Sequence, residues 1–130
     1  LFGFVAAQAG AQEIFGLETS ASAVASAKAN ARQMGVKADY RCAPSECLPS
    51  HLPEADLWIV DPPRDGLSDE VRQNLLEHAP SRIAYISCGP DTLARDLAQL
   101  STQYQIDSIQ LFDFFPRTAH FETLTMLSLR

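Results

Sequence analysis

One cysteine in this sequence stands where a nucleophile would be useful. Cys88 follows the β-branched and aromatic run Arg82–Ser87 and precedes Gly89 and Pro90, a pattern that predicts a buried strand, a turn and then a helix. The amino terminus of a helix stabilises a thiolate, which is the nucleophilic form of cysteine. The alternative is an inert cysteine in the core, because cysteine is among the residue types most often buried.

Two carboxylates also follow apolar runs. Glu18 comes after residues 13–17 and before a helical pattern, and in nucleotide-binding α/β sheets an acid at that place accepts hydrogen bonds from ribose hydroxyls. A solvated acid near a helix amino terminus is the alternative. Asp61 follows the apolar run 57–60, and the two prolines after it exclude both a strand ladder and a helix. We therefore expect Asp61 in an extended loop just past a strand.

Helical and strand patterns alternate along most of the chain. Strands are predicted over residues 13–17, 38–42, 57–60, 82–87, 105–112 and 121–129, and helices over residues 2–8 and 21–34, from Ser68 to before Pro80, and from about Pro90. The predicted helix ends are Gly10, Ser20 or Ser22, Gly35, Ser68, and Asp91 or Thr92. Residues 113–120 have no helical pattern, so the last two strands should be antiparallel.

These elements define an expected fold class. Alternating strands and helices closed by an antiparallel hairpin describe an α/β fold with a doubly wound sheet. The continuous apolar run 57–60 is typical of a central parallel strand. Ligands bind such sheets at the carboxyl ends of the strands, which is where Glu18, Asp61 and Cys88 fall.

The bulk composition excludes several classes. The 130 residues suit one domain, and no apolar run reaches the length of about 20 residues that crosses a bilayer. Cys42, Cys47 and Cys88 cannot all pair with one another, and no cluster supplies four zinc ligands, so we expect a reduced, cytoplasmic protein without a metal. A formal net charge of −6 argues against a large basic surface for nucleic acid on this chain.

Three motifs together resemble one family. Residues 61–67 read DPPRDGL, residues 87–96 read SCGPDTLARD, and residues 113–122 read DFFPRTAHFE. In this order they resemble the S-adenosylmethionine-dependent RNA uracil-5-methyltransferases, which modify tRNA or rRNA. The resemblance covers essentially all of residues 1–130, as the carboxyl-terminal part of the family's catalytic domain. It implies a Rossmann-like sheet that ends in an antiparallel hairpin and lacks its first strand.

The resemblance also implies roles for named residues. The Cys88 thiolate would add to carbon 6 of uracil, so that carbon 5 can attack the methyl group of S-adenosylmethionine, and Glu122 matches the base that removes the carbon-5 proton. Glu18 matches the ribose-binding acid, Asp61 an acid that faces the cofactor and target base, and Ser45 a group near the adenine. Without its motif, Glu122 would be interpreted as an exposed acid at a strand edge.

Two neighbouring residues, His120 and Arg64, have more than one possible role. His120 could orient Glu122 or simply pack against it. Arg64 could position Asp61, bind a phosphate, or form a surface ion pair.

The sequence also departs from the family pattern. The glycine-rich cofactor loop, the strand before it and the RNA-binding module would lie upstream of Leu1, so residues 1–130 alone are expected to bind the cofactor poorly and not to turn over. The RNA substrate would be gripped mainly by those upstream segments, and the protein is expected to be a monomer.

Two other functions fit parts of the sequence. An amino-group methyltransferase acting on adenine or glutamine also has a polar residue before Pro-Pro, although it needs no cysteine and an aromatic residue usually stands where Arg64 does. A catalytically inactive nucleotide- or RNA-binding domain would tolerate the missing glycine loop. Intact Cys88 and Glu122 favour the uracil enzyme over both.

Overall fold

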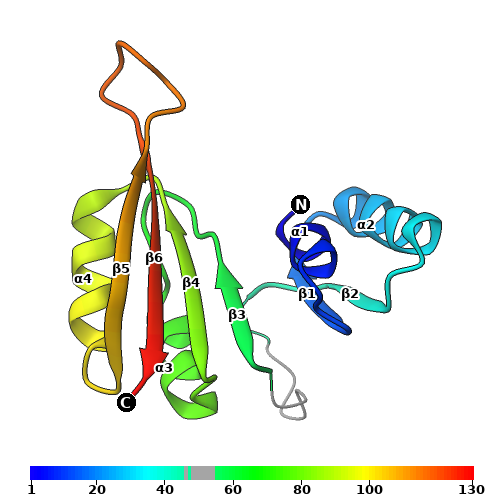
Figure 1. The fold of residues 1–130 in the computed structure, drawn as a ribbon, viewed down its shortest axis with the longest axis horizontal. Helices are drawn as coiled ribbons and strands as arrows, with labels where there is room; N and C mark the ends of the chain where they lie inside the picture. The colour runs from blue at the N-terminus through cyan, green and yellow to red at the C-terminus, as the bar shows by residue number, and fades with distance from the viewer. Residues whose placement is uncertain (46, 48–54) are drawn as a thin grey trace. The chain divides into compact units, whose positions relative to one another are not determined.

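The computed structural model describes residues 1–45, 47 and 55–130 (Figure 1). Along the chain the elements are α1 (Phe2–Gln8), β1 (Ile14–Glu18), α2 (Ala21–Met34), β2 (Ala38–Cys42), β3 (Leu57–Val60), α3 (Asp69–His78), β4 (Arg82–Ser87), α4 (Pro90–Leu100), β5 (Tyr104–Phe112) and β6 (Glu122–Leu129). They belong to two compact units, Leu1–Pro49 and Ser50–Arg130. No helix in the described part of the chain combines the length and the hydrophobicity that a membrane crossing requires.

The first unit pairs a two-stranded parallel sheet with α2. Strand β1 runs parallel to β2, with Ile14 opposite Ala38 and Glu18 opposite Cys42. The Ser20 hydroxyl accepts a hydrogen bond from the backbone N–H of Ala23 at the start of α2, and the left-handed residue Gly35 ends the helix. The predicted bounds of this helix are therefore confirmed, with Ser20 rather than Ser22 as the cap.

The second unit is a four-stranded mixed sheet in the order β3-β4-β6-β5. Strand β3 is parallel to β4, while β6 is antiparallel to both β4 and β5, so the predicted carboxyl-terminal hairpin is confirmed. The prediction of a central position for β3 is wrong within this sheet. No described strand pairs with the outer edge of β3, and its residues are at most half-buried.

Helices α3 and α4 cover one face of the four-stranded sheet (Figure 1). The buried core between them consists of Leu67, Val71, Leu75, Ile83, Tyr85, Leu93, Leu97, Leu100, Tyr104 and Leu127. Alternate residues of β4 point into this core, which fixes the register of the strand because a slip by one residue would expose them. The end of β4, and Cys88 after it, therefore have a defined position relative to α4.

The start of α4 differs from the prediction. Gly89 is the N-cap, Pro90 occupies the first helical position, and no side chain caps the helix, so neither Asp91 nor Thr92 has the predicted role. The Thr92 hydroxyl instead donates to the backbone carbonyls of Arg64 and Gly89, at 2.9 and 3.0 Å. The N-cap thus lies two residues before Asp91 and three before Thr92.

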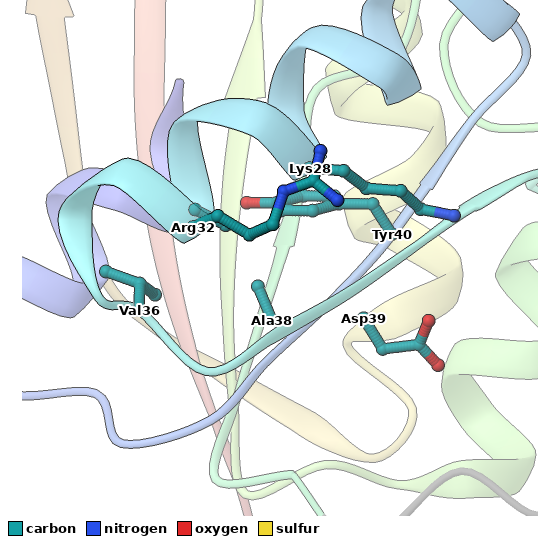
Figure 2. Close-up of a pocket in the computed structure, with 7 residues that line it drawn as sticks. Lys28, Arg32, Val36, Ala38, Asp39 and Tyr40 are labelled. Carbon is teal, nitrogen blue, oxygen red and sulfur yellow. The ribbon is translucent and has the colours of Figure 1, made fainter.

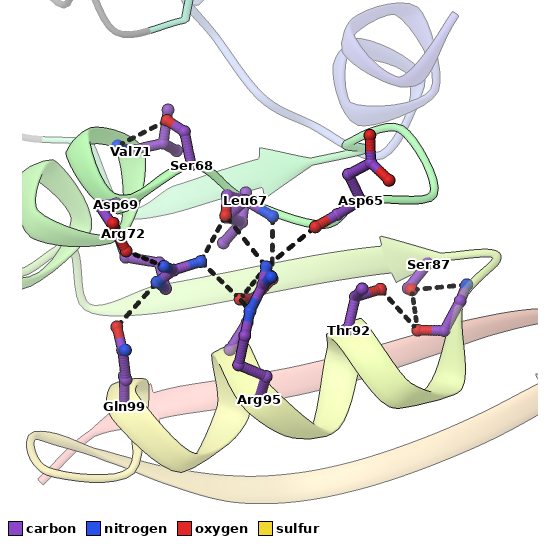
Figure 3. Close-up of polar contacts among 12 residues, drawn as sticks. Asp65, Leu67, Ser68, Asp69, Val71, Arg72, Ser87, Thr92, Arg95 and Gln99 are labelled. Carbon is purple, nitrogen blue, oxygen red and sulfur yellow. Dashed lines mark hydrogen bonds and ion pairs between the residues drawn. The ribbon is translucent and has the colours of Figure 1, made fainter.

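A buried carboxylate holds the loop after β3 against α4 (Figure 3). Asp96 is fully buried and accepts hydrogen bonds from the Leu67 backbone N–H at 2.8 Å and from the Tyr85 hydroxyl at 2.6 Å. Its other oxygen accepts from the guanidinium groups of Arg72 at 2.7 Å and Arg95 at 2.8 Å. The donors come from four parts of the chain, since Leu67 is in the loop after β3, Arg72 in α3, Tyr85 in β4 and Arg95 in α4. Asp96 therefore joins these elements into one network.

The network leaves no room for a side chain at Gly66. A Cβ built on this residue would lie 2.6 Å from Asp96 Oδ2 and 2.7 Å from a terminal nitrogen of Arg95. The backbone of Gly66 is also left-handed, with φ of 76°. Glycine is therefore required for the loop to approach α4 so closely.

The network also shifts the pKa of two of its members. Although burial opposes ionisation, hydrogen bonds from Tyr85, the Leu67 backbone and Arg95 hold the pKa of the Asp96 carboxyl below its ordinary value. Burial, together with the neighbouring Asp96 charge, raises the pKa of the Tyr85 hydroxyl well above its usual range. The pair is therefore an ionised carboxylate and a neutral phenol.

We expect Asp96→Ala to destabilise the chain by about 3–5 kcal/mol, because it leaves the buried Arg72 guanidinium without its buried partner. Asp69 also pairs with Arg72, but its side chain is 88% exposed, so Asp69→Ala should cost no more than about 1 kcal/mol. Urea unfolding of both variants measures the difference. Equal, small losses would contradict the assignment of Asp96 as the anchor.

The lowered pKa of Asp96 gives a pH dependence with a definite sign. Its carboxylate contributes stability in full above the ordinary pKa of 3.8, and this contribution is lost as the pH falls below that value through the folded-state pKa. The free energy of unfolding should therefore decrease steeply in acid for the wild-type chain and for Asp69→Ala, and less steeply for Asp96→Ala. Parallel pH profiles for all three chains would show that other groups account for the acid sensitivity.

Candidate active site

The turn that holds Cys88 is shaped by two hydroxyl groups. The Ser87 hydroxyl both donates to the Gly89 carbonyl and accepts from the Gly89 backbone N–H, each at 3.1 Å. The Thr123 hydroxyl on the neighbouring strand donates to the Ser87 carbonyl at 3.1 Å. Cys88 between them is a half-buried free cysteine, so the turn that carries it is held in place while the residue is not sealed in the core.

The loop after β3 approaches this turn directly. Thr92 connects them through its hydrogen bonds to the carbonyls of Arg64 and Gly89. A Cβ at Gly89 would lie 3.0 Å from the Arg64 carbonyl oxygen and 2.8 Å from the Thr92 hydroxyl. Glycine at position 89 therefore allows the backbone of the first motif to lie against the cysteine turn.

A pocket of about 280 Å³ brings the three sequence motifs together. It is lined by Arg64 of the first motif, Cys88 of the second, and Phe115, His120 and Glu122 of the third. The structure thus places the predicted nucleophile and the predicted base on one cavity. A thiol and a carboxylate that face the same space can act on opposite sides of one small planar ligand.

The first and third motifs are joined by one hydrogen bond across the pocket. A terminal nitrogen of Arg64 lies 3.1 Å from His120 Nδ1. A guanidinium can only donate, so Nδ1 must accept and the ring proton of neutral His120 must sit on Nε2. The sequence left His120 and Arg64 unassigned, and the structure makes Arg64 the residue that orients the histidine.

The loop that supplies His120 is organised by Thr118. Its backbone N–H and its hydroxyl both donate to the Phe115 carbonyl, at 3.1 and 2.7 Å, and its hydroxyl accepts from the His120 backbone N–H at 3.1 Å. Arg117 within this turn has a left-handed backbone, with φ of 70°. The turn directs Phe115 and His120 toward the same pocket.

Asp61 lies at the end of β3 as expected, but it is not among the described residues that line the Cys88 pocket. Partial burial raises the pKa of the Asp61 carboxyl above its ordinary value. Its role next to the target base therefore stays a prediction.

The remaining predicted residues belong to the first unit. Glu18 ends β1, and one of its oxygens accepts from the Ser20 backbone N–H at 2.8 Å and from the Thr19 hydroxyl at 3.3 Å. The Ser20 N–H holds the pKa of the exposed Glu18 carboxyl below its ordinary value. The second oxygen makes no hydrogen bond within the described residues and is free for a ligand. Ser45 lies exposed in a turn that follows β2.

A second pocket, of about 230 Å³, lies between α2 and β2 (Figure 2). Lys28 and Arg32 from the helix line it together with Asp39 and Tyr40 from the strand. It contains no thiol and no paired carboxylates, so it lacks the groups for the chemistry predicted at Cys88. Elsewhere in the described ranges, no set of three or more His, Cys, Asp or Glu side chains is placed to hold a metal ion.

Sequence reasoning missed Phe115 as a pocket residue. The signal was present, because residues 112–115 contain three phenylalanines in a segment that also has turn residues. Phenylalanine in a connection, where it cannot be buried by a strand or helix pattern, indicates either a local core or a binding surface.

Comparison with solved structures gives the fold class. The tRNA (uracil-54, C5)-methyltransferase of Pyrococcus abyssi, solved in complex with S-adenosyl-L-homocysteine, matches with a TM-score of 0.85 at 34% sequence identity, over 97% of this chain and 31% of that chain. The PH0226 protein of Pyrococcus horikoshii OT3 matches with a TM-score of 0.72 at 9% identity, over 99% of this chain and 76% of that chain, a likeness of fold alone. The chain has the Rossmann-like methyltransferase fold, which confirms the predicted class.

Sequence comparisons narrow this class to one family. Residues 51–130 match the model of the family described as tRNA (Uracil-5-)-methyltransferase. An uncharacterized RNA methyltransferase of Thermosynechococcus vestitus is 43% identical over 120 residues, covering 89% of this chain and 27% of the relative. The 23S rRNA (uracil(747)-C(5))-methyltransferase RlmC of Shewanella pealeana is 43% identical over 118 residues, covering 86% of this chain and 30% of the relative.

The chain belongs to the tRNA (uracil-5-)-methyltransferase family, so the resemblance carried by the three motifs is confirmed. It spans between a quarter and a third of the length of these two relatives.

The Arg64 to His120 hydrogen bond predicts a single histidine tautomer. At mildly alkaline pH, two-dimensional ¹H–¹⁵N spectra should show His120 with its proton on Nε2, and Arg64→Ala should give a mixture of tautomers. His78 on α3, whose ring lies 5.4 Å from that of Trp58 on β3, should be unchanged and serves as the control. A proton on Nδ1 of His120 in the wild-type chain would contradict the hydrogen bond.

Proposed function

We propose that this chain is part of an RNA uracil-5-methyltransferase in which Cys88 is the nucleophile and Glu122 the base. The observation that supports this most strongly is the shared pocket, because Cys88 and Glu122 are 34 residues apart in the chain and line one cavity. Membership of the uracil-5-methyltransferase family supports the same reaction. The proposed domain assignment is the carboxyl-terminal part of the catalytic domain, over residues 1–130.

The first step uses the thiolate form of Cys88. The thiolate forms a bond to carbon 6 of the uracil, and the electron pair of the 5,6 double bond moves toward the carbon-4 carbonyl as an enolate. Carbon 5 thereby becomes nucleophilic, which it is not in free uracil. Ser87 and Gly89 hold the turn, so that the sulfur is positioned before the substrate arrives.

The second step needs the carboxylate. After methyl transfer carbon 5 holds both the new methyl group and its original proton. Glu122 takes that proton, the electron pair restores the 5,6 double bond, and the bond from carbon 6 to Cys88 breaks to return the thiolate. His120, fixed by Arg64 as an Nε2–H donor, is placed on the same pocket and can donate to a carbonyl oxygen of the ring.

The residues of the first unit fit a nucleoside cofactor. Glu18 stands at the carboxyl end of β1 with one oxygen occupied by its own turn and the other free, and its lowered pKa keeps it ionised and able to accept from ribose hydroxyls. We propose that Glu18 and Ser45 bind S-adenosylmethionine, and that Asp61 of the second unit also contacts this cofactor. When bound, this cofactor supplies the methyl group as an electrophile.

An RNA containing the target uridine is the proposed substrate. Names of relatives cover both kinds of RNA, since one is a 23S rRNA enzyme and another a tRNA enzyme. The net charge of −6 leaves most of the phosphate binding to other parts of the protein. A cytoplasmic location and action as a monomer fit this proposal.

A 5-fluorouridine RNA tests the nucleophile. With this RNA and S-adenosylmethionine, the full-length protein should form a covalent adduct that survives denaturation, because the base cannot remove fluorine as it removes a proton. Cys88→Ala should form none, whereas Cys42→Ala, which removes an exposed cysteine of the first unit, should form as much as wild type. An amino-group methyltransferase or an inactive binding domain would give no adduct at all, so the absence of an adduct with the wild-type protein would refute the proposal.

Glu122→Gln tests the base. It should reduce turnover by about 10²- to 10⁴-fold, and a methylated covalent complex with ordinary uridine RNA should accumulate, because the carbon-5 proton is no longer removed. Glu70→Gln changes an exposed acid on α3 and should leave turnover unaltered. Equal turnover with no trapped complex would mean that another group is the base.

A further inference from the structure

Three phenylalanine rings lie exposed beside the Cys88 pocket. Phe112, Phe114 and Phe115 are 36%, 66% and 50% exposed. Two other aromatic residues of the same unit, Tyr85 and Tyr104, are buried in its core. They occupy the end of β5 and the start of its connection to β6, which extends beyond the end of the sheet (Figure 1). Adjacent exposed aromatic rings of this kind indicate a binding surface for a ligand or a partner molecule.

Two independent contacts connect these rings to the pocket. Phe115 is one of the residues that line it. Phe112 is the direct partner of Glu122 across the β5–β6 ladder, so the two side chains stand side by side on one face of the sheet. The aromatic surface is therefore continuous with the cavity that holds the proposed nucleophile and base.

The rings of Phe112 and Phe114 are already stacked. Their centroids lie 5.7 Å apart and their planes are inclined by only 10°. Two parallel rings at the edge of a cavity present a flat face of fixed orientation, and little conformational freedom is lost when a second flat group stacks on them.

We propose that the aromatic platform formed by Phe112 and Phe114 stacks on an RNA base adjacent to the target uridine. This inference rests on the proposed function and adds to it how the substrate is held at the pocket. Attack on carbon 6 requires access to the face of the uracil ring, so the uridine must leave its stack. The neighbouring base then loses a stacking partner, and an exposed phenylalanine ring replaces it.

Two arginines near the platform suit an RNA partner, and the connection from β5 to β6 also contains one acid, Asp113. Arg117 in the same connection is exposed and makes no ion pair within the described residues, and Arg64 lies at the pocket itself. Arg117 belongs to the turn that follows the platform, so its guanidinium can supply the positive group that the phosphate of a stacked nucleotide would need. An apolar protein surface would need no such charge.

A double-mutant cycle between protein and RNA tests the platform. The full-length protein is titrated with an RNA that contains the target uridine and with two matched RNAs in which the nucleotide on its 5′ or 3′ side is abasic. Phe114→Leu, which keeps an apolar side chain but removes the ring, should weaken binding of the intact RNA by about 5- to 100-fold. Phe114→Tyr should restore affinity to within about threefold of wild type, because it restores the ring.

The coupling between the Phe114→Leu substitution and the removal of one RNA base decides whether the ring stacks on that base. For one of the abasic RNAs, wild type and Phe114→Leu should bind equally, because the base that stacks on the ring is absent. Ile109→Ala is the matched control: Ile109 is exposed on the same strand, but it points to the opposite face from Phe112 and should bind all three RNAs like wild type.

Each other outcome overturns the inference. If Phe114→Leu weakens binding of all three RNAs by the same factor, or does not weaken it, the ring does not stack on a neighbouring base. Formation of the Cys88 adduct with 5-fluorouridine RNA by wild type and by Phe114→Leu at saturating RNA is measured in parallel. An adduct without coupling rejects the platform alone, whereas no adduct in wild type rejects the proposed function.

Discussion

The buried carboxylate of Asp96 is the interaction on which the second unit depends. It fixes the loop after β3 through the Leu67 N–H, it fixes α4 because it is part of that helix, and it fixes β4 through the Tyr85 hydroxyl. Cys88 lies between β4 and α4, and Arg64 lies in the loop. A single ionised group therefore helps to fix the positions of two residues that line the Cys88 pocket, although it does not line the pocket itself.

The pocket joins two parts of the chain that are held in place by different contacts. Arg64 and Cys88 are attached to the packed side of the sheet through Thr92, Gly89 and the Asp96 network. Phe115 and His120 come instead from a projecting connection that is organised by its own turn. The hydrogen bond from Arg64 to His120 links the two parts, so the proposed nucleophile and His120 are held at one pocket before a ligand binds.

Local patterns in the sequence were sufficient for much of this arrangement. The bounds of α2, the Ser68 cap of α3, the antiparallel hairpin and the positions of Glu18, Asp61 and Cys88 at strand ends all follow from signals within a few residues. Long-range contacts account for what could not be predicted. Asp96 in a helical pattern suggests a solvated side chain, and only the folded chain brings Arg72 and Tyr85 to it. The position of β3 at a sheet edge and the contribution of Phe115 to the pocket have the same origin.

A crystal structure of the full-length protein trapped with a 5-fluorouridine RNA would test the central claim, that one thiol and one carboxylate act on a single pyrimidine. We predict continuous electron density from the Cys88 sulfur to carbon 6 of the fluorinated ring, with the Glu122 carboxylate facing the substituents on carbon 5. Density that connects the ring to Cys42 or Cys47, or a ring bound at Cys88 with Glu122 directed away from carbon 5, would contradict this account.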